Sequence, residues 1–435
     1  MNVRLSLFLA LRNIAGSKKG GSSLKQLRNA VIGVFLSLIP LVVVLEVANG
    51  MIEGITRRYI EIGTYHLQAR SFMNGDEGEL DNAIQSIKDL EDVVVAIPVI
   101  QGLGLAYSFG GRTGITVRAL PPDIYEKDPL LRKYLTVKEG AFNLSEYNYV
   151  LLSTEVAKKL QVACGDSIKI LTALVVPGRP PILRPTEFTV QGIFSTGYFE
   201  LDTLSAYISI EAGFKLFKDS GARFIGIKVK EPYNSLVKSY FDIMSRLPQG
   251  FQLYTWYEIE KSMYKAFETT KRLLLFIMVL IVCVASVNIS SSLVMLVMEK
   301  RQEIAILKSA GTSHKIITLS YLLTGFFIGV AGSFFGLGGG LLVAVNINTV
   351  IQFLEGVINA GIALFQGFIS PFSVTSPVNF KIFDSAYYLE TIPIKLSFFE
   401  LFGIVSLTVL LSTFVSYFPA RKAGKLRPLD ILQKH

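Results

Sequence analysis

The stretch "LLLFIMVLIVCVASVNISSSLVMLVM", Leu273–Met298, runs directly into "EKRQEIAILKSAGTSHKII", Glu299–Ile317. The first stretch is long and apolar enough to cross a hydrocarbon core, which takes about 20 mostly apolar residues. The second is charged and rich in residues that favour helices, and the chain then becomes apolar again. This order predicts a membrane span, a short helix outside the membrane, and a second span.

The same criterion predicts four spans in the 435-residue chain, at residues 30–50, 272–298, 317–345 and 398–418. The formal net charge is +9, and Lys and Arg concentrate in three segments: 1–29, which we expect to be an amphipathic N-terminal segment, 299–316 and the tail 419–435. Four spans place these segments on one side, and the positive-inside rule makes that side the cytoplasm. Both termini are therefore expected to be cytoplasmic, and the positive charge does not indicate nucleic-acid binding.

Residues 51–256 are numerous enough for a complete domain and fall on the opposite, periplasmic side. Residues 257–271 contain no Gly or Pro and are expected to form a stalk helix, while residues 346–397 are expected to form a periplasmic loop. We therefore expect an α+β membrane protein with four transmembrane helices and a large α+β periplasmic domain between helices 1 and 2. Strand-like runs cover 93–100, 104–109, 114–120, 149–153, 167–176, 187–194, 206–210 and 224–230, and helix-like runs cover 79–90, 154–160, 211–217 and 235–246.

The sequence shows no pattern typical of catalysis or metal binding. There is no phosphate-binding loop, no nucleophile elbow, and the three histidines have no metal-ligand spacing. The glycines of "GLGGG", Gly336–Gly340, lie within a predicted span, where small residues allow helices to pack closely. We therefore expect no catalytic residue, no metal and no cofactor on this chain, so that any energy-driven work depends on a partner.

The charged segment after Met298 is expected to be a helix from Glu299 to Ala310. Gly311 can end it in the left-handed conformation, and Thr312 or Ser313 can cap the next helix. Two interpretations of this helix remain open. It is either an interfacial turn that rests on lipid headgroups or a docking knob for a cytoplasmic partner.

The stretch "VMEKRQEIAILKSAG", Val297–Gly311, resembles the signature after the second span in ABC transporter permeases of the class that contains the macrolide exporters and the FtsX proteins. The resemblance to the lipoprotein-releasing permeases of the LolC/LolE family is closer and covers nearly the whole chain. The other agreeing stretches, in order, are Leu7–Lys18, Val47–Ile55, Asp128–Leu135, Leu151–Ile170, "FTVQGIFSTGYFELD" at Phe188–Asp202, and Tyr417–Leu432.

This resemblance implies that the helix after the second span is a coupling helix, which lies in a groove of a separate ATPase subunit. It also implies a complex with two copies of that ATPase, which bind the ATP and Mg, and with a second permease, either a sister or an identical chain. The residues that would contact the ATPase are Glu299, Arg301, Glu303, Ile304, Leu307 and Lys308.

The resemblance further implies a location in the bacterial inner membrane, lipoproteins as cargo and a periplasmic lipoprotein carrier as acceptor. The acyl chains would enter a cleft between the outer ends of spans one and two, although plain packing against membrane lipids explains the same residues. Glu46, about one turn from the outer end of span one, is interpreted as reaching the interface by snorkelling. The cleft residues would be Val47, Met51, Ile55, Phe267, Leu273 and Leu274.

The stretch "LTALVVPGRPPILRPTEF", Leu171–Phe188, has two strand-like flanks around a tip rich in Pro, Gly and Arg. Pro is poorly tolerated inside a sheet, so this pattern predicts a protruding hairpin. Its position resembles that of the hook by which LolC-type subunits hold the carrier, and an ordinary long hairpin is the other reading. The hook residues would be Pro177, Gly178, Arg179, Pro180, Pro181 and Arg184.

Two other functions stay open at this point. One is an FtsX-like scaffold that activates a cell-wall hydrolase, and the other is a subunit of a macrolide-type exporter. The sequence also leaves open whether the chain is of the LolC or the LolE type. Residues 350–374 are read either as a membrane-resting helix pair or as part of a dimer contact.

Overall fold

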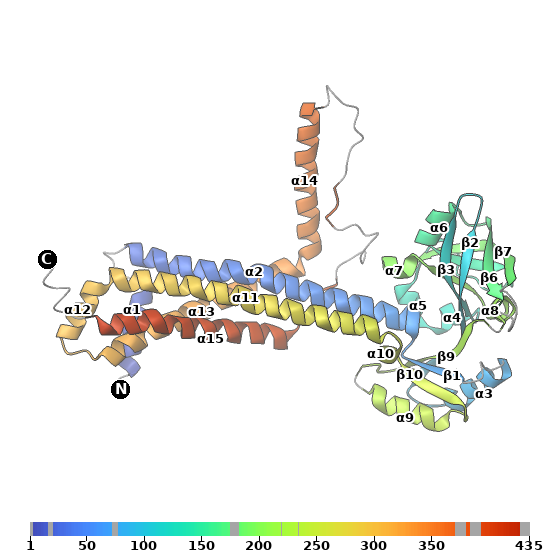
Figure 1. Ribbon diagram of the computed structural model, residues 1–435, viewed down its shortest axis with the longest axis horizontal. Helices are drawn as coiled ribbons and strands as arrows, with labels where there is room; N and C mark the ends of the chain where they lie inside the picture. The colour runs from blue at the N-terminus through green and yellow to red at the C-terminus, as the bar shows by residue number, and fades with distance from the viewer. Residues whose placement is uncertain are drawn as a thin grey trace. The chain divides into compact units, whose positions relative to one another are not determined.

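The computed structural model describes residues 3–15, 21–71, 77–174, 182–218, 220–233, 235–369, 380–382 and 393–426 (Figure 1). The chain divides into two compact units. The helical unit comprises Met1–Met51, Phe267–Phe380 and Ile392–His435, and the α+β unit comprises Ile52–Ala266 and Lys381–Thr391.

The helical unit contains long apolar helices and a few short ones. Four stretches are long and apolar enough to cross a membrane by length and composition: Lys25–Thr64, Lys261–Glu299, His314–Val345 and Phe398–Lys425. Each of these helical stretches contains one of the four predicted spans, and the first three also extend beyond the N-terminal end of the prediction. The helices are α1 (Val3–Ala15), α2 (Gly21–Arg58), α11 (Lys261–Glu299), α12 (Arg301–Ser309), α13 (His314–Val345), α14 (Ile347–Ile369) and α15 (Phe398–Lys425).

One apolar core joins α2, α11, α12, α13 and α15. The long helices among them run side by side in Figure 1. Val34 and Leu38 of α2, Ile289 of α11, Ile304 of α12 and Ile404 of α15 are among its members, each at most 3% exposed. α11 continues without interruption from Lys261, which confirms a helix that runs into span two, but Glu260 separates it from α10 (Trp256–Ile259). The expected stalk is thus helical on either side of one non-helical residue.

Glycines of α13 set its distance from both neighbouring helices. A Cβ added at Gly336 would lie 2.8 Å from Cβ of Leu38, which is closer than carbon atoms approach in proteins. Gly338 instead has nothing within 4 Å of such an atom. Close packing was predicted for this glycine run, and it is confirmed at Gly336 and Gly340. Gly332 faces Val34, Gly340 faces Val42, and on α15 Ser416 and Ser412 face Gly325 and Gly329.

A helix, α14, occupies part of the segment that was expected to be a loop. It begins at Ile347, with only Asn346 between it and α13, and turns away from the other helices of this unit (Figure 1). Its polar residues Asn348, Gln352, Glu355 and Asn359 recur at helical spacing and share one face. A helix at Ile347–Ile369 agrees with the helical reading of residues 350–374, and the periplasmic position expected for residues 346–397 stays a prediction.

The α+β unit is built on a sheet that has ten strands among the described residues, in the order β10-β1-β9-β2-β3-β8-β5-β7-β4, with β6 paired to β2 and β7. Most pairs are antiparallel, but β3 with β8 and β5 with β7 are parallel. The strands are β1 (Leu67–Ser71), β2 (Val93–Tyr107), β3 (Arg112–Leu120), β4 (Thr136–Gly140), β5 (Tyr149–Ser153), β6 (Ser167–Leu174), β7 (Ile182–Ser195), β8 (Ser205–Ser209), β9 (Ala222–Val229) and β10 (Phe251–Thr255).

Short helices and one π-helix complete this unit. The apolar residues of α3, α8 and α9 pack on the strands and close two of the unit's cores. The π-helix η1 (Tyr59–Thr64) follows directly after α2. The helices are α3 (Glu77–Lys88), α4 (Ile124–Lys127), α5 (Pro129–Tyr134), α6 (Thr154–Leu160), α7 (Phe199–Asp202), α8 (Ile210–Phe217) and α9 (Leu236–Arg246).

The predicted strands agree with the structure except in two respects. The runs at 93–100 and 104–109 form one strand, β2, which passes through Gly102. Gly102 is needed there because the ring of Phe217 occupies the space that a Cβ would fill. The short strands β1, β4 and β10 were not predicted.

Candidate functional site

The segment between spans two and three forms the short helix that the sequence predicts. α11 ends at Glu299, Lys300 interrupts the helical backbone, and α12 follows. Gly311 has a φ of 91°, so it makes the left-handed stop that was expected. Ser313 is the N-cap of α13, without a side-chain hydrogen bond.

The helical period of α12 separates its residues into two faces. Ile304 is 3% exposed and belongs to the core of the helical unit, whereas Ile306 is 60% exposed. Arg301 and Glu303 are also exposed, and Glu303 pairs with Nζ of Lys300 at 2.6 Å. Ile304, one of the six residues expected to contact an ATPase, therefore packs in the core of the helical unit and is not available for a contact with a partner.

Lys308 also has an internal role. Its Nζ donates hydrogen bonds to the carbonyl oxygens of Gly424 at 2.8 Å and of Leu426 at 2.7 Å. Carbonyl groups at the end of a helix have no partner within the helix, and a cation there also interacts favourably with the helix dipole. Lys308 thus attaches α12 to the C-terminal end of α15. Glu299 is exposed and Leu307 is half-buried, so both remain part of the candidate surface.

A polar cluster connects α2, α11 and α15. Nδ2 of Asn49 donates to Oε2 of Glu400 at 2.6 Å, and Nζ of Lys271 lies 2.5 Å from Oε1 of the same carboxylate. The backbone N–H of Ser397 donates to Oε2 of Glu46 at 3.3 Å. Glu46 has no exposed surface, so the snorkelling interpretation is wrong. Its side chain instead faces the N-terminal end of α15, where backbone N–H groups attract negative charge.

The residues expected to form an acyl cleft occupy different environments. Leu273 is 58% exposed, whereas Val47, Met51 and Phe267 are half-buried, and Ile55 packs with Tyr198 and Leu201 in the α+β unit. Leu274 lines an apolar cavity of about 150 Å³ between α2 and α11. The other lining residues, which were not predicted, are Pro40, Leu41, Val44 and Leu45 of α2 and Ile277, Met278 and Ile281 of α11.

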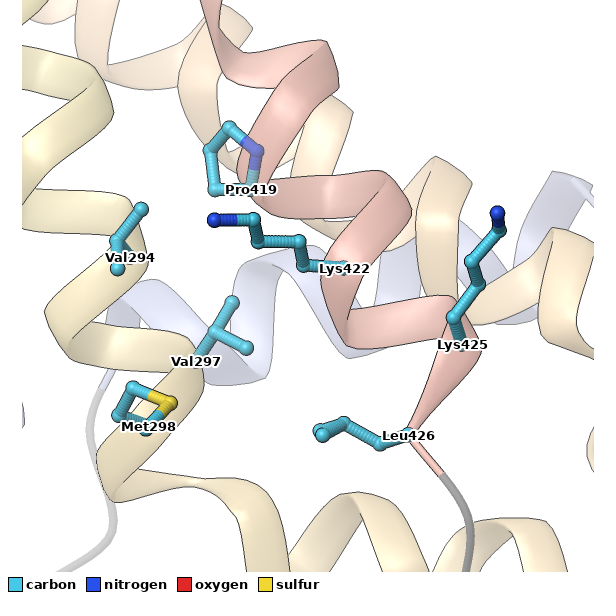
Figure 2. A pocket seen from close by; sticks show the side chains of 7 residues that line it. All are labelled: Val294, Val297, Met298, Pro419, Lys422, Lys425 and Leu426. Atoms are coloured by element: carbon cyan, nitrogen blue, oxygen red, sulfur yellow. The ribbon is translucent and has the colours of Figure 1, made fainter.

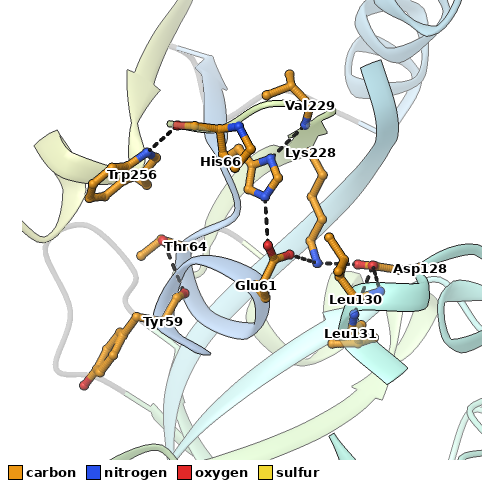
Figure 3. A network of polar contacts seen from close by, with 11 residues as sticks. Tyr59, Glu61, Thr64, His66, Asp128, Leu130, Leu131, Lys228, Val229 and Trp256 are labelled. Carbon is orange, nitrogen blue, oxygen red and sulfur yellow. Dashed lines mark hydrogen bonds and ion pairs between the residues drawn. The ribbon is translucent and has the colours of Figure 1, made fainter. Parts of the chain in front are cut away.

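Within the α+β unit, buried charges surround the π-helix η1. Nζ of Lys228 lies 2.9 Å from Oε2 of Glu61 and 2.6 Å from Oδ2 of Asp128, and the lysine side chain is 1% exposed (Figure 3). Oδ1 of Asp128 accepts the backbone N–H groups of Leu130 and Leu131, which caps α5. One buried lysine therefore joins η1, β9 and the start of α5.

His66 extends this network toward the start of α10. Its Nδ1 accepts the backbone N–H of Val229 at 2.8 Å, so the ring proton lies on Nε2, which donates to Oε1 of Glu61 at 3.1 Å (Figure 3). Its carbonyl oxygen accepts the backbone N–H of Trp256. The network thus fixes the π-helix that follows α2 and the residue at which α10 begins.

The stretch "STGYFELD" forms a turn that closes on Asp202. Thr196 donates to this carboxylate from its backbone N–H at 2.9 Å and from its hydroxyl at 2.7 Å, and the Ser195 hydroxyl donates at 2.8 Å. Burial raises the pKa of Asp202 in spite of these bonds. Arg58, the last residue of α2, donates from Nε to the carbonyl oxygen of Thr196 at 3.0 Å. This turn therefore holds the end of α2.

The predicted hairpin is present, because β6 and β7 pair antiparallel from Ser167 with Thr189 as far as Leu174 with Ile182. Arg184 is exposed on β7. Residues 175–181, which include the expected hook residues Pro177, Gly178, Arg179, Pro180 and Pro181, lie outside the described residues.

In the described part of the chain, no group of three or more His, Cys, Asp or Glu side chains could hold a metal ion. The buried network of Lys228 was missed from the sequence. The one indication of this network in the sequence is that Lys228 lies on the same strand face as Phe224 and Gly226, where buried residues are expected.

Comparisons with known proteins agree with these features. The MacB-like periplasmic core domain matches residues 30–236, and the FtsX-like permease C-terminal domain matches residues 275–428. The lipoprotein-releasing system transmembrane protein LolC of Neisseria meningitidis serogroup B is 24% identical over 436 residues, which cover 99% of each chain. The LolE protein of Haemophilus influenzae is 23% identical over 442 residues, covering 98% of this chain and 99% of the relative.

Among solved structures, the periplasmic region of MacB from Actinobacillus actinomycetemcomitans covers 47% of this chain and 95% of that structure. Its identity is 13% and its TM-score is 0.30. The chain thus contains a MacB-like periplasmic core domain followed by an FtsX-like permease C-terminal domain, and along nearly its whole length it is similar to the LolC and LolE proteins of lipoprotein-releasing systems.

Proposed function

We propose that this chain is the permease subunit of an ATP-driven transporter in the bacterial inner membrane, which extracts lipoproteins from the outer leaflet and passes them to a periplasmic carrier. The observation that carries the proposal is the similarity to LolC proteins along 99% of both chains. The FtsX-like scaffold and the macrolide-type exporter are less supported, because each explains only part of the matched length.

The proposed work begins at α12. An ATPase subunit binds the exposed side of this helix around Arg301 and Glu303, and closure of two ATPase copies moves it. α12 can pass the movement on because its inner face is part of the bundle core and Lys308 holds the end of α15. ATP and Mg bind to the ATPase copies, and this chain supplies no catalytic group.

The proposal that lipoproteins are the cargo requires an apolar surface that can receive their acyl chains. Burying acyl chains stabilises them by about 0.8 kcal/mol per methylene, so removing a lipid-anchored protein from the bilayer requires work. The cavity between α2 and α11 and the exposed side chain of Leu273 provide apolar surface for acyl chains. A second permease, identical or a sister, completes the cleft, and both termini lie in the cytoplasm.

The contact with the ATPase is tested by Glu303→Arg combined with Leu307→Ala. Both residues lie on α12 outside the buried face, so we expect the permease to insert normally. ATP hydrolysis stimulated by the assembled complex should fall about tenfold, which corresponds to the loss of one strong interface contact.

The matched control changes Glu91 to Arg and Leu204 to Ala, two exposed residues of the α+β unit. This control should retain full hydrolysis. Unchanged hydrolysis in the α12 variant would show that α12 is not the coupling helix.

The carrier contact is tested separately on the β6–β7 hairpin. Deleting residues 176–184 should abolish recovery of the periplasmic carrier in a pull-down with the whole complex, and Arg184→Ala should weaken it. Arg112→Ala changes another exposed arginine of the same unit and serves as the control. Equal recovery with and without residues 176–184 would contradict the hook.

A further inference from the structure

A pocket lies between the ends of α11 and α15. It has a volume of about 450 Å³, and its floor includes Val294, Val297 and Met298 of α11 together with Leu426 (Figure 2). Lys422 and Lys425 of α15 border it, and Lys422 extends toward the α11 residues (Figure 2). An apolar pocket with two cations at its edge matches a molecule that has an apolar body and an anionic head.

The two lysines are free to bind such a head. Both are exposed, and neither Lys422 nor Lys425 forms an ion pair with a carboxylate anywhere in the described residues. Leu426 is fixed at the pocket wall because its carbonyl oxygen accepts a hydrogen bond from Lys308. The contact that attaches α12 to α15 therefore also holds one lining residue of the pocket in place.

The apolar lining of the pocket continues along an exposed apolar stripe of α11. Leu280, Val287 and Val294 follow one another at intervals of seven residues on α11, so they share one face of the helix. They are 50%, 58% and 37% exposed. Hydrocarbon chains can extend from the pocket along this stripe toward the middle of the bilayer, while the head stays at the lysines.

We propose that this pocket binds an anionic phospholipid of the cytoplasmic leaflet. The phosphate lies between Lys422 and Lys425, and the acyl chains lie against Val294 and Met298. Basic pockets between membrane helices on the cytoplasmic side suit anionic head groups, because each lysine near such a surface contributes about 1 kcal/mol. The site lies beside the attachment of α12, so the lipid stabilises the position in which α12 is held.

The proposal goes beyond lipoprotein release and is tested without cargo. Phosphatidylglycerol is added to the detergent-purified full complex, and bound lipid is counted by native mass spectrometry, with phosphatidylcholine of the same acyl chains as the neutral probe. K422Q with K425Q should weaken phosphatidylglycerol binding by about 25-fold, that is about fivefold for each lysine. Phosphatidylcholine binding should stay weak and unchanged.

Two further variants separate a pocket from a general surface charge. K25Q with K315Q removes two exposed lysines outside the pocket and should leave phosphatidylglycerol binding within twofold of the unchanged complex. Val294→Trp fills the pocket, keeps both border lysines and should weaken binding at least fivefold.

Three results would overturn the proposal. The first is that the variant K422Q with K425Q binds phosphatidylglycerol within twofold of the unchanged complex. The second is that the control K25Q with K315Q loses as much phosphatidylglycerol binding as that variant. The third is unchanged lipid binding in Val294→Trp together with loss of a protein subunit, which would make the pocket a protein contact. Release activity does not enter this measurement, so the proposal can fail while the transporter function stands.

Discussion

Replacing Lys228 by Met should strongly destabilise the α+β unit. Methionine is also long and unbranched, but the change leaves Glu61 and Asp128 buried without their cation. Removing one partner of a buried ion pair costs about 3–5 kcal/mol. The lower end of this range applies here, because both carboxylates keep other hydrogen bonds. Glu61 still accepts one from Nε2 of His66, and Asp128 still accepts two from backbone N–H groups.

A loss of about 3 kcal/mol should lower the midpoint of thermal unfolding by roughly 6–12 °C for a unit of this size. The single tryptophan of the chain, Trp256, reports this transition. Its backbone N–H is bonded to His66 and its indole N–H to the carbonyl oxygen of Pro232, so its fluorescence should change as the network opens. The measurement uses the full chain in detergent.

Lys230 provides the matched control, two residues further along the chain. Its side chain is 56% exposed and lies 3.9 Å from Glu91, so Lys230→Met should change stability by less than about 0.5 kcal/mol. Adding Glu61→Gln to K228M should recover part of the loss, because one unpaired charge is removed. A loss below about 1 kcal/mol in K228M, or an equal loss in K230M, would refute this reasoning.

Other predictions concern the helical unit and are measured as thermal stability in detergent. Gly336→Ala should cost about 1–3 kcal/mol because the new methyl group overlaps α2, whereas Gly338→Ala should be neutral or slightly stabilising because its surroundings are open; equal effects would contradict the close packing. Asn49→Ala should cost about 1–3 kcal/mol because Glu400 loses a buried donor at 2.6 Å. Glu46→Gln should change the free energy of unfolding by less than about 0.5 kcal/mol. One carboxylate oxygen of Glu46 has no hydrogen-bond partner in the described structure, and the amide oxygen of Gln can still accept the bond from the backbone N–H of Ser397. A large loss of stability would show that the charge is required.

The elements that the sequence predicted well are those with a strong local pattern. Each predicted span is one long apolar run. Gly311, which ends α12, has a positive φ that few residues other than glycine adopt. The strands at Tyr149–Ser153 and Ala222–Val229 are dense in β-branched or large apolar residues. These signals lie within about 20 residues of chain and require no knowledge of the partner elements.

Features that depend on distant pairing could not be predicted in the same way. Glu61, Asp128 and Lys228 are far apart in sequence and meet only because η1, α5 and β9 lie together. The short strands β1 and β10 are five residues each and gain their stability from the sheet. For α14 the polar residues recur at helical spacing and a helix pair was one reading of residues 350–374, but glycines at 356 and 361 weaken the helical pattern, so the bounds of the helix required the structure.

The orientation of α12 also required the structure. Its sequence offers several apolar residues, and only the packing shows that Ile304 is inside while Ile306 is outside. Lys308 has the charge expected of a partner contact, but its bonds go to α15. The charged residues of such a helix thus divide into internal and external contacts, and composition does not tell them apart.

The bonds from Lys308 to Gly424 and Leu426 have a mechanical consequence. A load applied to α12 leaves it through the peptide chain into α11 and α13, through the apolar packing of Ile304, and through an ammonium group into α15. The ammonium group thus loads α15 in parallel with the other helices, and without it the chain and the apolar contacts carry the whole force. Under the proposed coupling of α12 to an ATPase, a chain without this lysine should still assemble but move α15 less in each ATP cycle of the partner.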